Sequence, residues 1–136
     1  MALTRPSLKL TQDAALALVQ AAAEAATAMG VPQCIAVVDE GCNLLAFLRM
    51  DGARVLSIDS ARRKAETAAA MGKPSGAMHA EVEIKLAIAS DGRMTNLKGG
   101  MPIIVEGQVV GGIGIGSGTG DQDREIAAAA IARVFG

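Results

Sequence analysis

The chain has 136 residues and a net charge of −1; 51% of its residues are hydrophobic, with two Phe and neither Trp nor Tyr. That length can bury a core without disulfides or metal ions, and it predicts a single domain over residues 1–136. The charge is nearly balanced and aromatic residues for base stacking are almost absent, so we expect no nucleic-acid partner. No stretch approaches the roughly 18 apolar residues that span a bilayer, so we expect no membrane partner either.

The first half of the chain predicts a helix, a hairpin and a second helix. Thr11 is expected to cap a helix that ends near residue 29, before a Gly and a Pro. Two short apolar strands are expected over residues 34–38 and 44–50. The second helix is expected over residues 55–71, with the basic run 62–64 on its solvated side.

The second half predicts a third helix, a second hairpin and a last helix. Ser75 is the expected cap of a helix over residues 77–89. Strands are expected over 103–105 and 109–115, followed by an alanine-rich helix over 121–135. The order is therefore helix, two strands, two helices, two strands and helix. Because both strand pairs are hairpins, the expected class is α/β in the α+β sense, with a mainly antiparallel sheet and flanking helices.

The second hairpin has an unusual glycine pattern. Glu106 and Gly107 form its expected turn, and Gly112, Gly114 and Gly116 recur at every second position of the strand that follows. Side chains alternate between the two faces of a strand, so one face here has no side chains. A helix, a second chain or a flat ligand can approach such a face closely.

A glycine-rich loop then leads into the last helix, and it is the main candidate binding site. Its candidate residues are Ser117, Gly118, Thr119, Gly120 and Asp121. The glycine spacing does not match a dinucleotide fingerprint or a Walker loop, and Ser117 does not match a nucleophile elbow. The backbone N–H groups at the helix entry could bind an anionic group such as a carboxylate. Alternatively, Thr119 and Asp121 only cap the helix. The acidic Asp121 and Asp123 argue against phosphate.

Three further side chains are candidates for chemistry. His79 is the only histidine and lies four residues before Glu83, so the two would share a helix face. They are the candidate catalytic pair, and alternatively a surface hydrogen-bonded pair. No metal site is expected, because a third ligand is not evident. Arg49 ends a strand and could hold an acidic substrate, or could pair with a nearby carboxylate.

The two cysteines, Cys34 and Cys42, fall in the first hairpin at positions that do not face each other. Free thiols are therefore expected, which favours a reducing compartment and a cytoplasmic location. No secretory signal is evident, although a chain from which a signal had been removed would look the same.

Several blocks, in the same order, resemble the GlcG/HbpS family, which includes haem-binding proteins, glycolate-utilisation-associated proteins and the C-terminal domain of PduO-type cobalamin adenosyltransferases. The blocks are residues 35–41, 44–53, 57–61, 64–68, 99–118 and 121–123. The resemblance covers essentially the whole chain. It implies a profilin-like domain, a tendency to form homo-oligomers, and haem as a possible ligand because some members bind it.

The sequence is compatible with three functional hypotheses. The first is an oligomeric binding protein that holds a small organic ligand, or a tetrapyrrole such as haem, between the glycine face, the 117–121 loop and the helix with His79. The second is a cofactor-independent isomerase or lyase of small organic acids. There His79 or Glu83 would be the base, and Arg49 or the loop N–H groups would hold a carboxylate. The third makes the glycine face an oligomer contact only.

Overall fold

A four-stranded antiparallel sheet, in the order β2-β1-β4-β3, forms the centre of the molecule. The computed structural model describes residues 1–136. Its elements are α1 (Gln12–Met29), β1 (Cys34–Asp39), β2 (Leu44–Arg49), α2 (Ser57–Met71), α3 (Ala80–Ala89), β3 (Gly100–Val105), β4 (Gln108–Gly116) and α4 (Gly120–Phe135). The two hairpins β1–β2 and β3–β4 are joined through the antiparallel pairing of β1 with β4. The expected α+β class with an antiparallel sheet is therefore confirmed.

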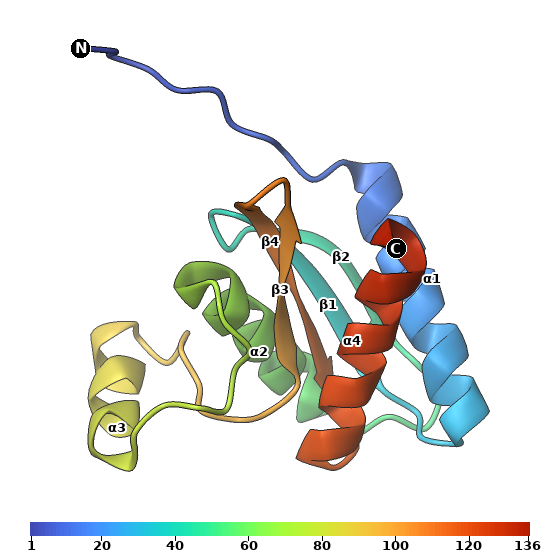
Figure 1. Ribbon diagram of the computed structural model, residues 1–136. Coiled ribbons are helices and arrows are strands. Elements are labelled where there is room, and N and C mark those ends of the chain that lie inside the picture. The colour runs from blue at the N-terminus through green and yellow to red at the C-terminus, as the bar shows by residue number, and fades with distance from the viewer.

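Helices cover both faces of this sheet (Figure 1). Helices α1 and α4 pack side by side on one face, and α2 lies on the other. Helix α3 stands beyond α2, away from the sheet, and has no buried residue. The N-terminal residues extend away from the body of the molecule. No helix has the length and hydrophobicity needed to cross a membrane.

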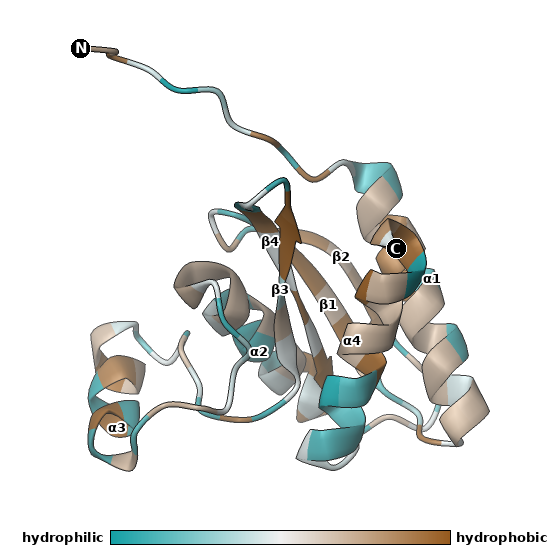
Figure 2. Cartoon of the chain, in the orientation of Figure 1, coloured by the Kyte–Doolittle hydropathy of each residue, from teal (hydrophilic) through white to brown (hydrophobic).

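Alternation along the two central strands produces two different faces. Ile35 and Val37 of β1, and Ile113 and Ile115 of β4, point toward α1 and α4 and join the larger apolar core. Their neighbours on the opposite face of β1 join a smaller cluster with alanines of α2. The members of that cluster are Cys34, Ala36, Val38, Ala61, Ala65 and Ala69. Figure 2 shows the hydrophobic strands between the helices.

The glycine face of β4 lies directly beneath α2. A side chain at Gly114 would overlap the backbone carbonyl of Ala61, and one at Gly112 would overlap that of Ala65. The two backbones approach this closely because both contact surfaces consist of glycine and alanine. Of the three partners considered from the sequence, a helix of the same chain is therefore the one that covers this face.

Most of the helix caps and turns predicted from the sequence are confirmed. The Thr11 hydroxyl accepts a hydrogen bond from the Ala14 N–H, and Gly30 ends α1 in the left-handed conformation. Thr119 and Gln122 form a reciprocal capping box at the start of α4. The β3–β4 turn has φ values of 50° at Glu106 and 75° at Gly107. Positive φ at both central residues is the requirement of a type I′ hairpin turn.

Two local expectations are wrong. Ser75 does not cap the third helix, which begins at Ala80 with His79 as its N-cap. The Ser75 hydroxyl instead donates to the Leu97 carbonyl and accepts from the Gly100 N–H, so it connects the segment before α3 to the start of β3. Lys64 is not on the solvated side of α2, since only 5% of it is exposed.

Candidate functional site

The loop between β4 and α4 is held by hydrogen bonds from distant parts of the chain. The Gly118 N–H donates to Gln33 Oε1 and to Asp123 Oδ1, and the Ser117 hydroxyl accepts from the Arg54 N–H at 2.9 Å. Ser117 has a φ of 103°, an unfavourable conformation for a residue with a side chain. The loop is therefore fixed in one conformation by its surroundings.

A buried ion pair lies beside this loop. Lys64 Nζ is 2.9 Å from Asp123 Oδ2 and 2.8 Å from the carbonyl oxygen of Ile115. Asp123 is 1% exposed, and its second oxygen accepts the bond from Gly118. Both charges are thus paired and hydrogen-bonded, as buried charges must be. An ammonium group has three N–H donors, and two of those on Lys64 are used within the chain.

A pocket of about 250 Å³ opens where α2, the loop and the start of α4 meet. Its lining residues are Arg54, Leu56, Ser57, Ser60, Lys64, Leu97, Lys98, Ser117, Gly118, Gly120 and Asp123. We call it the loop pocket. Three cationic side chains line it against one carboxylate, and the N-terminus of α4 adds positive potential. The loop pocket is therefore suited to an anionic group.

One wall of the loop pocket is a polar stripe on α2. Ser57, Ser60 and Lys64 are three and four residues apart, so they lie on one side of the helix. Both serines line the pocket, and neither hydroxyl has a hydrogen-bond partner within the chain. Ser57 as a residue is only 6% exposed, but its hydroxyl oxygen is not one of the buried unpaired atoms, so it is open to the pocket.

The loop residues expected from the sequence are only partly assembled here. Ser117, Gly118 and Gly120 line the loop pocket. Thr119 is engaged in the helix cap, and Asp121 is exposed and paired with Lys98 at 3.3 Å. The cap alternative is therefore correct for Thr119. The Asp121 N–H has no backbone acceptor within the chain, so it remains free.

The expected glycine and arginine contacts lie elsewhere. Gly114 and Gly116 are buried beneath α2 and so do not line a groove. Arg49 is exposed at the end of β2, opposite Cys34 of β1, and it does not line the loop pocket.

His79 and Glu83 are not linked to each other. His79 is exposed at the N-cap of α3, and its ring makes no hydrogen bond within the chain. Glu83 Oε2 instead accepts a hydrogen bond from Asn96 Nδ2 at 2.6 Å. No group of three His, Cys, Asp or Glu side chains comes together as a metal site would require. An acid–base pair of His79 and Glu83 has no support in this geometry.

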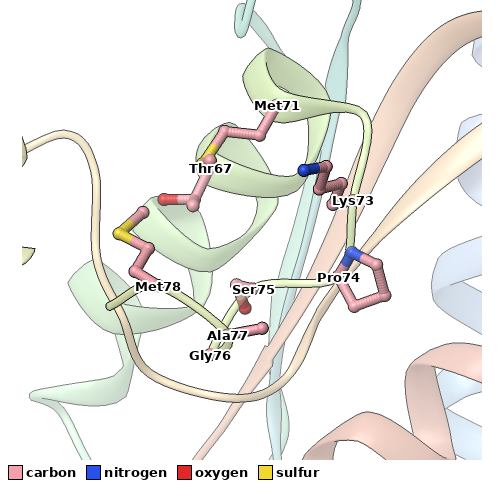
Figure 3. Close-up of a pocket in the computed structure, with 8 residues that line it drawn as sticks. All are labelled: Thr67, Met71, Lys73, Pro74, Ser75, Gly76, Ala77 and Met78. Atoms are coloured by element: carbon pink, nitrogen blue, oxygen red, sulfur yellow. The ribbon is translucent and has the colours of Figure 1, made fainter. Parts of the chain in front are cut away.

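A second hollow, of about 70 Å³, lies between α2 and the segment that leads to α3 (Figure 3). Met71 and Met78 lie to one side of it, and Lys73 to another. The Thr67 hydroxyl donates to the Arg63 carbonyl and accepts from the Thr95 N–H. The Ser75 hydroxyl is paired as described above. Because these hydroxyls are already satisfied, the hollow offers few free groups to a ligand.

Both cysteines are free, as expected. Burial raises the pKa of the Cys34 thiol despite the opposing effect of Arg49. Burial is also the main cause of the raised pKa of Cys42, whose thiol donates to the Glu66 carbonyl. Neither residue lines the loop pocket. Cys34 is buried and Cys42 is half-buried, so both thiols belong to the packing against α2 rather than to this site.

Sequence reasoning missed the most buried members of the site. The sequence places Lys64 in a solvated basic run and gives Asp123 only the role of an acidic residue that argues against phosphate. The spacing of Ser57, Ser60 and Lys64 was a usable signal for this site. It places three polar residues on the side of α2 whose alanines pack on the glycine face of β4. The partner 59 residues away could not be inferred from spacing.

Comparisons with known proteins agree with this fold. A family model described as "Haem degrading protein HbpS-like" matches residues 10–132. The chain is 35% identical to Protein GlcG of Escherichia coli K12 over 107 residues, which cover 77% of this chain and 79% of that protein.

Two solved structures are also similar. A double mutant of Streptomyces reticuli HbpS superposes with a TM-score of 0.85 and 36% identity, over 96% of this chain and 90% of that one. A structure described as a PduOC:heme complex superposes with a TM-score of 0.84 and 30% identity, over 92% and 94% of the two chains. The match to the family model covers nearly the whole chain, and with the similarities to GlcG and to these structures it shows that this protein belongs to the GlcG/HbpS family.

Proposed function

We propose that this protein is a homo-oligomeric binding protein that takes a small organic molecule with an acidic group into the loop pocket. The observation that carries the proposal is the loop pocket itself, where Arg54, Lys64 and Lys98 meet the N-terminus of α4. Lys98 forms an ion pair with Asp121, whereas the Arg54 guanidinium forms no ion pair within the chain. An acidic ligand would supply the missing counter-charge.

Haem is a second candidate ligand, favoured by the similarity to the PduOC haem complex. The loop pocket itself does not fit haem, because no His, Cys, Met or Tyr lines it to ligate the iron. The hollow of Figure 3 is too small for a porphyrin. The only imidazole, His79, is exposed on α3. Haem would therefore bind at the protein surface through His79.

Self-association is supported by the exposed apolar side chains of α3. Ile84 is 68% exposed and Ile88 is 73% exposed, and hydrophobic segments are visible on α3 in Figure 2 although it stands apart from the sheet. An isolated helix of 10 residues is too short to be stable in water without packing against something. A second copy of the chain is the proposed cover. Analytical ultracentrifugation of wild type and of Ile84→Glu/Ile88→Glu tests this, because a smaller assembly is expected for the variant.

The ligand-binding proposal is tested by NMR. Amide resonances of residues 117–121 should move when acetate, pyruvate or succinate is added, and inorganic phosphate is the comparison anion. The proposal would be contradicted if only amide resonances outside residues 117–121 shifted. It would also be contradicted if no organic acid shifted any resonance. A parallel haem titration of wild type and His79→Ala decides the second candidate. A Soret shift that is lost in His79→Ala supports surface ligation, and an unchanged shift excludes His79.

A further inference from the structure

The structure points to a more specific recognition element within the loop pocket. We infer that Ser57, Ser60 and Lys64 of α2 bind the carboxylate of the ligand directly, and that the ligand is a short monocarboxylic acid. This inference rests on the proposed function, because it concerns the same pocket. It adds which residues receive the acidic group and which class of acid they accept.

Unused hydrogen-bond donors on α2 are the first reason. The Ser57 and Ser60 hydroxyls have no hydrogen-bond partner within the chain, and both residues line the pocket. Neither oxygen is one of the buried unpaired atoms, so both hydroxyls are open to the pocket, where a carboxylate can replace the water bonded to them. Lys64 retains one N–H after bonding to Ile115 and Asp123. Three donors on one side of one helix therefore face the same pocket, and a carboxylate has enough acceptor sites for all three.

The position of the charge is the second reason. Arg54 and Lys98 are exposed, and Lys98 already has Asp121 as a partner, so an ion pair with either would be weakened by solvent. Lys64 is 5% exposed, and an acidic group that reaches it is largely withdrawn from water. A hydrogen bond to a charged group is stronger there than at the rim. The buried wall should therefore contribute more affinity than the exposed cations.

At the buried wall of the pocket, Asp123 favours a singly charged acid over a doubly charged one. It lines the pocket as an acceptor of bonds from Lys64 and Gly118, so its carboxylate stays beside the bound ligand. Like charges at short range repel, and the repulsion is larger for a doubly charged phosphate than for a carboxylate. The volume of about 250 Å³ is below the usual range for drug-sized ligands, so the acid should also be short.

Substitution of both serines is the main test. Ser57→Ala/Ser60→Ala removes two donors that have no partner in the chain, so the fold should be retained. Acetate, butyrate and inorganic phosphate are titrated by NMR against wild type, this double variant and the control Ser7→Ala, which alters an exposed N-terminal residue. We expect the double variant to bind acetate and butyrate at least about tenfold more weakly, as the loss of hydrogen bonds to a charged group implies. Ser7→Ala should match wild type, and phosphate should bind wild type more weakly than acetate.

Arg54→Gln separates this inference from the proposed function. We expect it to weaken acetate binding by only about threefold, because an exposed ion pair contributes little. If Arg54→Gln abolishes binding while the double serine variant binds like wild type, the acid is held at the rim; the inference is then wrong and the proposed function stands. If no organic acid perturbs the wild-type loop, both are wrong. Tighter binding of phosphate than of acetate would overturn the assigned ligand class.

Lys64 is tested without substitution, because changing a buried charge could unfold the protein. Its side-chain resonances, Cε and Nζ, are followed in wild type during the acetate titration. A saturable shift with the same Kd as the loop amides is expected if Lys64 contacts the ligand. An unchanged Lys64 signal at saturation would remove it from the recognition element.

Discussion

The two faces of the sheet bury their residues in different ways. On the α1 and α4 face, large aliphatic side chains such as Ile113, Ile115 and Ile126 fill the space between sheet and helices. On the α2 face, glycine and alanine bring two backbones almost into contact. Close approach leaves little room for large side chains, and it places the polar stripe of α2 beside the end of β4. One face therefore provides stability through apolar volume, while the other also positions a pocket.

Gly114→Val should have the largest effect, because it adds a side chain where β4 meets the backbone of α2. Since the neighbour is a main-chain carbonyl, it cannot move aside as a flexible side chain could. We expect a loss of more than about 4 kcal/mol in the free energy of unfolding, or no folded protein. Ile113→Val, the neighbouring residue on the other face, is the control, at about 1 kcal/mol. Urea unfolding measures both, and a stable Gly114→Val protein would contradict the close packing.

Lys64→Met should cause the second largest loss in the free energy of unfolding. It leaves Asp123 buried without its ionic partner, and breaking a buried pair typically costs about 3–5 kcal/mol. Lys64→Met/Asp123→Leu removes both charges and should recover part of that loss. Thermal and urea unfolding of the single and double variants measure the coupling. If the single and double variants were equally stable, the unpaired Asp123 charge would not be the cause of the destabilisation.

Ile126→Ala tests the apolar face. Ile126 is fully buried on α4, and truncation of such a side chain should cost about 3 kcal/mol. It should leave acetate binding at the loop pocket unchanged, because it belongs to the aliphatic core that faces away from α2. A large change in affinity with unchanged fold would mean that the two faces are coupled.

Thr119→Ala should have a smaller effect. It removes the side-chain half of the capping box on α4, which typically costs about 1 kcal/mol. Thr119→Ser, which keeps the hydroxyl, is the matched control and should restore most of the loss. A neutral Thr119→Ala would indicate that the loop is held mainly by Gln33, Arg54 and Asp123.

Raising the pH should produce the smallest loss of stability. The loss would arise on the α2 face of the sheet, where both thiols pack. Burial raises the pKa of Cys34 and of Cys42 above the ordinary value of 9.0. The unfolded chain therefore loses these protons first, so stability is fully present below about pH 9 and declines as pH rises above it. Cys34→Ala/Cys42→Ala should flatten this decline. Unfolding curves between pH 7 and 10 that remain parallel for both proteins would contradict the assignment.

Short-range signals in the sequence predicted most of the fold. Threonine caps, helix-ending glycines and the Glu106–Gly107 turn act within a few residues, and they were confirmed in place. The start of α3 was wrong because the Ser75 hydroxyl bonds to Leu97 and Gly100, which are distant in sequence. A tertiary contact overrode a local capping preference there.

The candidate site was predicted less completely than the fold. The sequence by itself determined the antiparallel hairpins, the bare glycine face and the capped entry to α4, because each depends on alternation, turn chemistry or helix capping over a few positions. Only the tertiary structure decided that α2 covers the glycine face and that Lys64 meets Asp123 beside Gly118. The physical reason is that burial of a charge depends on which distant backbone approaches it, and here glycine and alanine permit that approach.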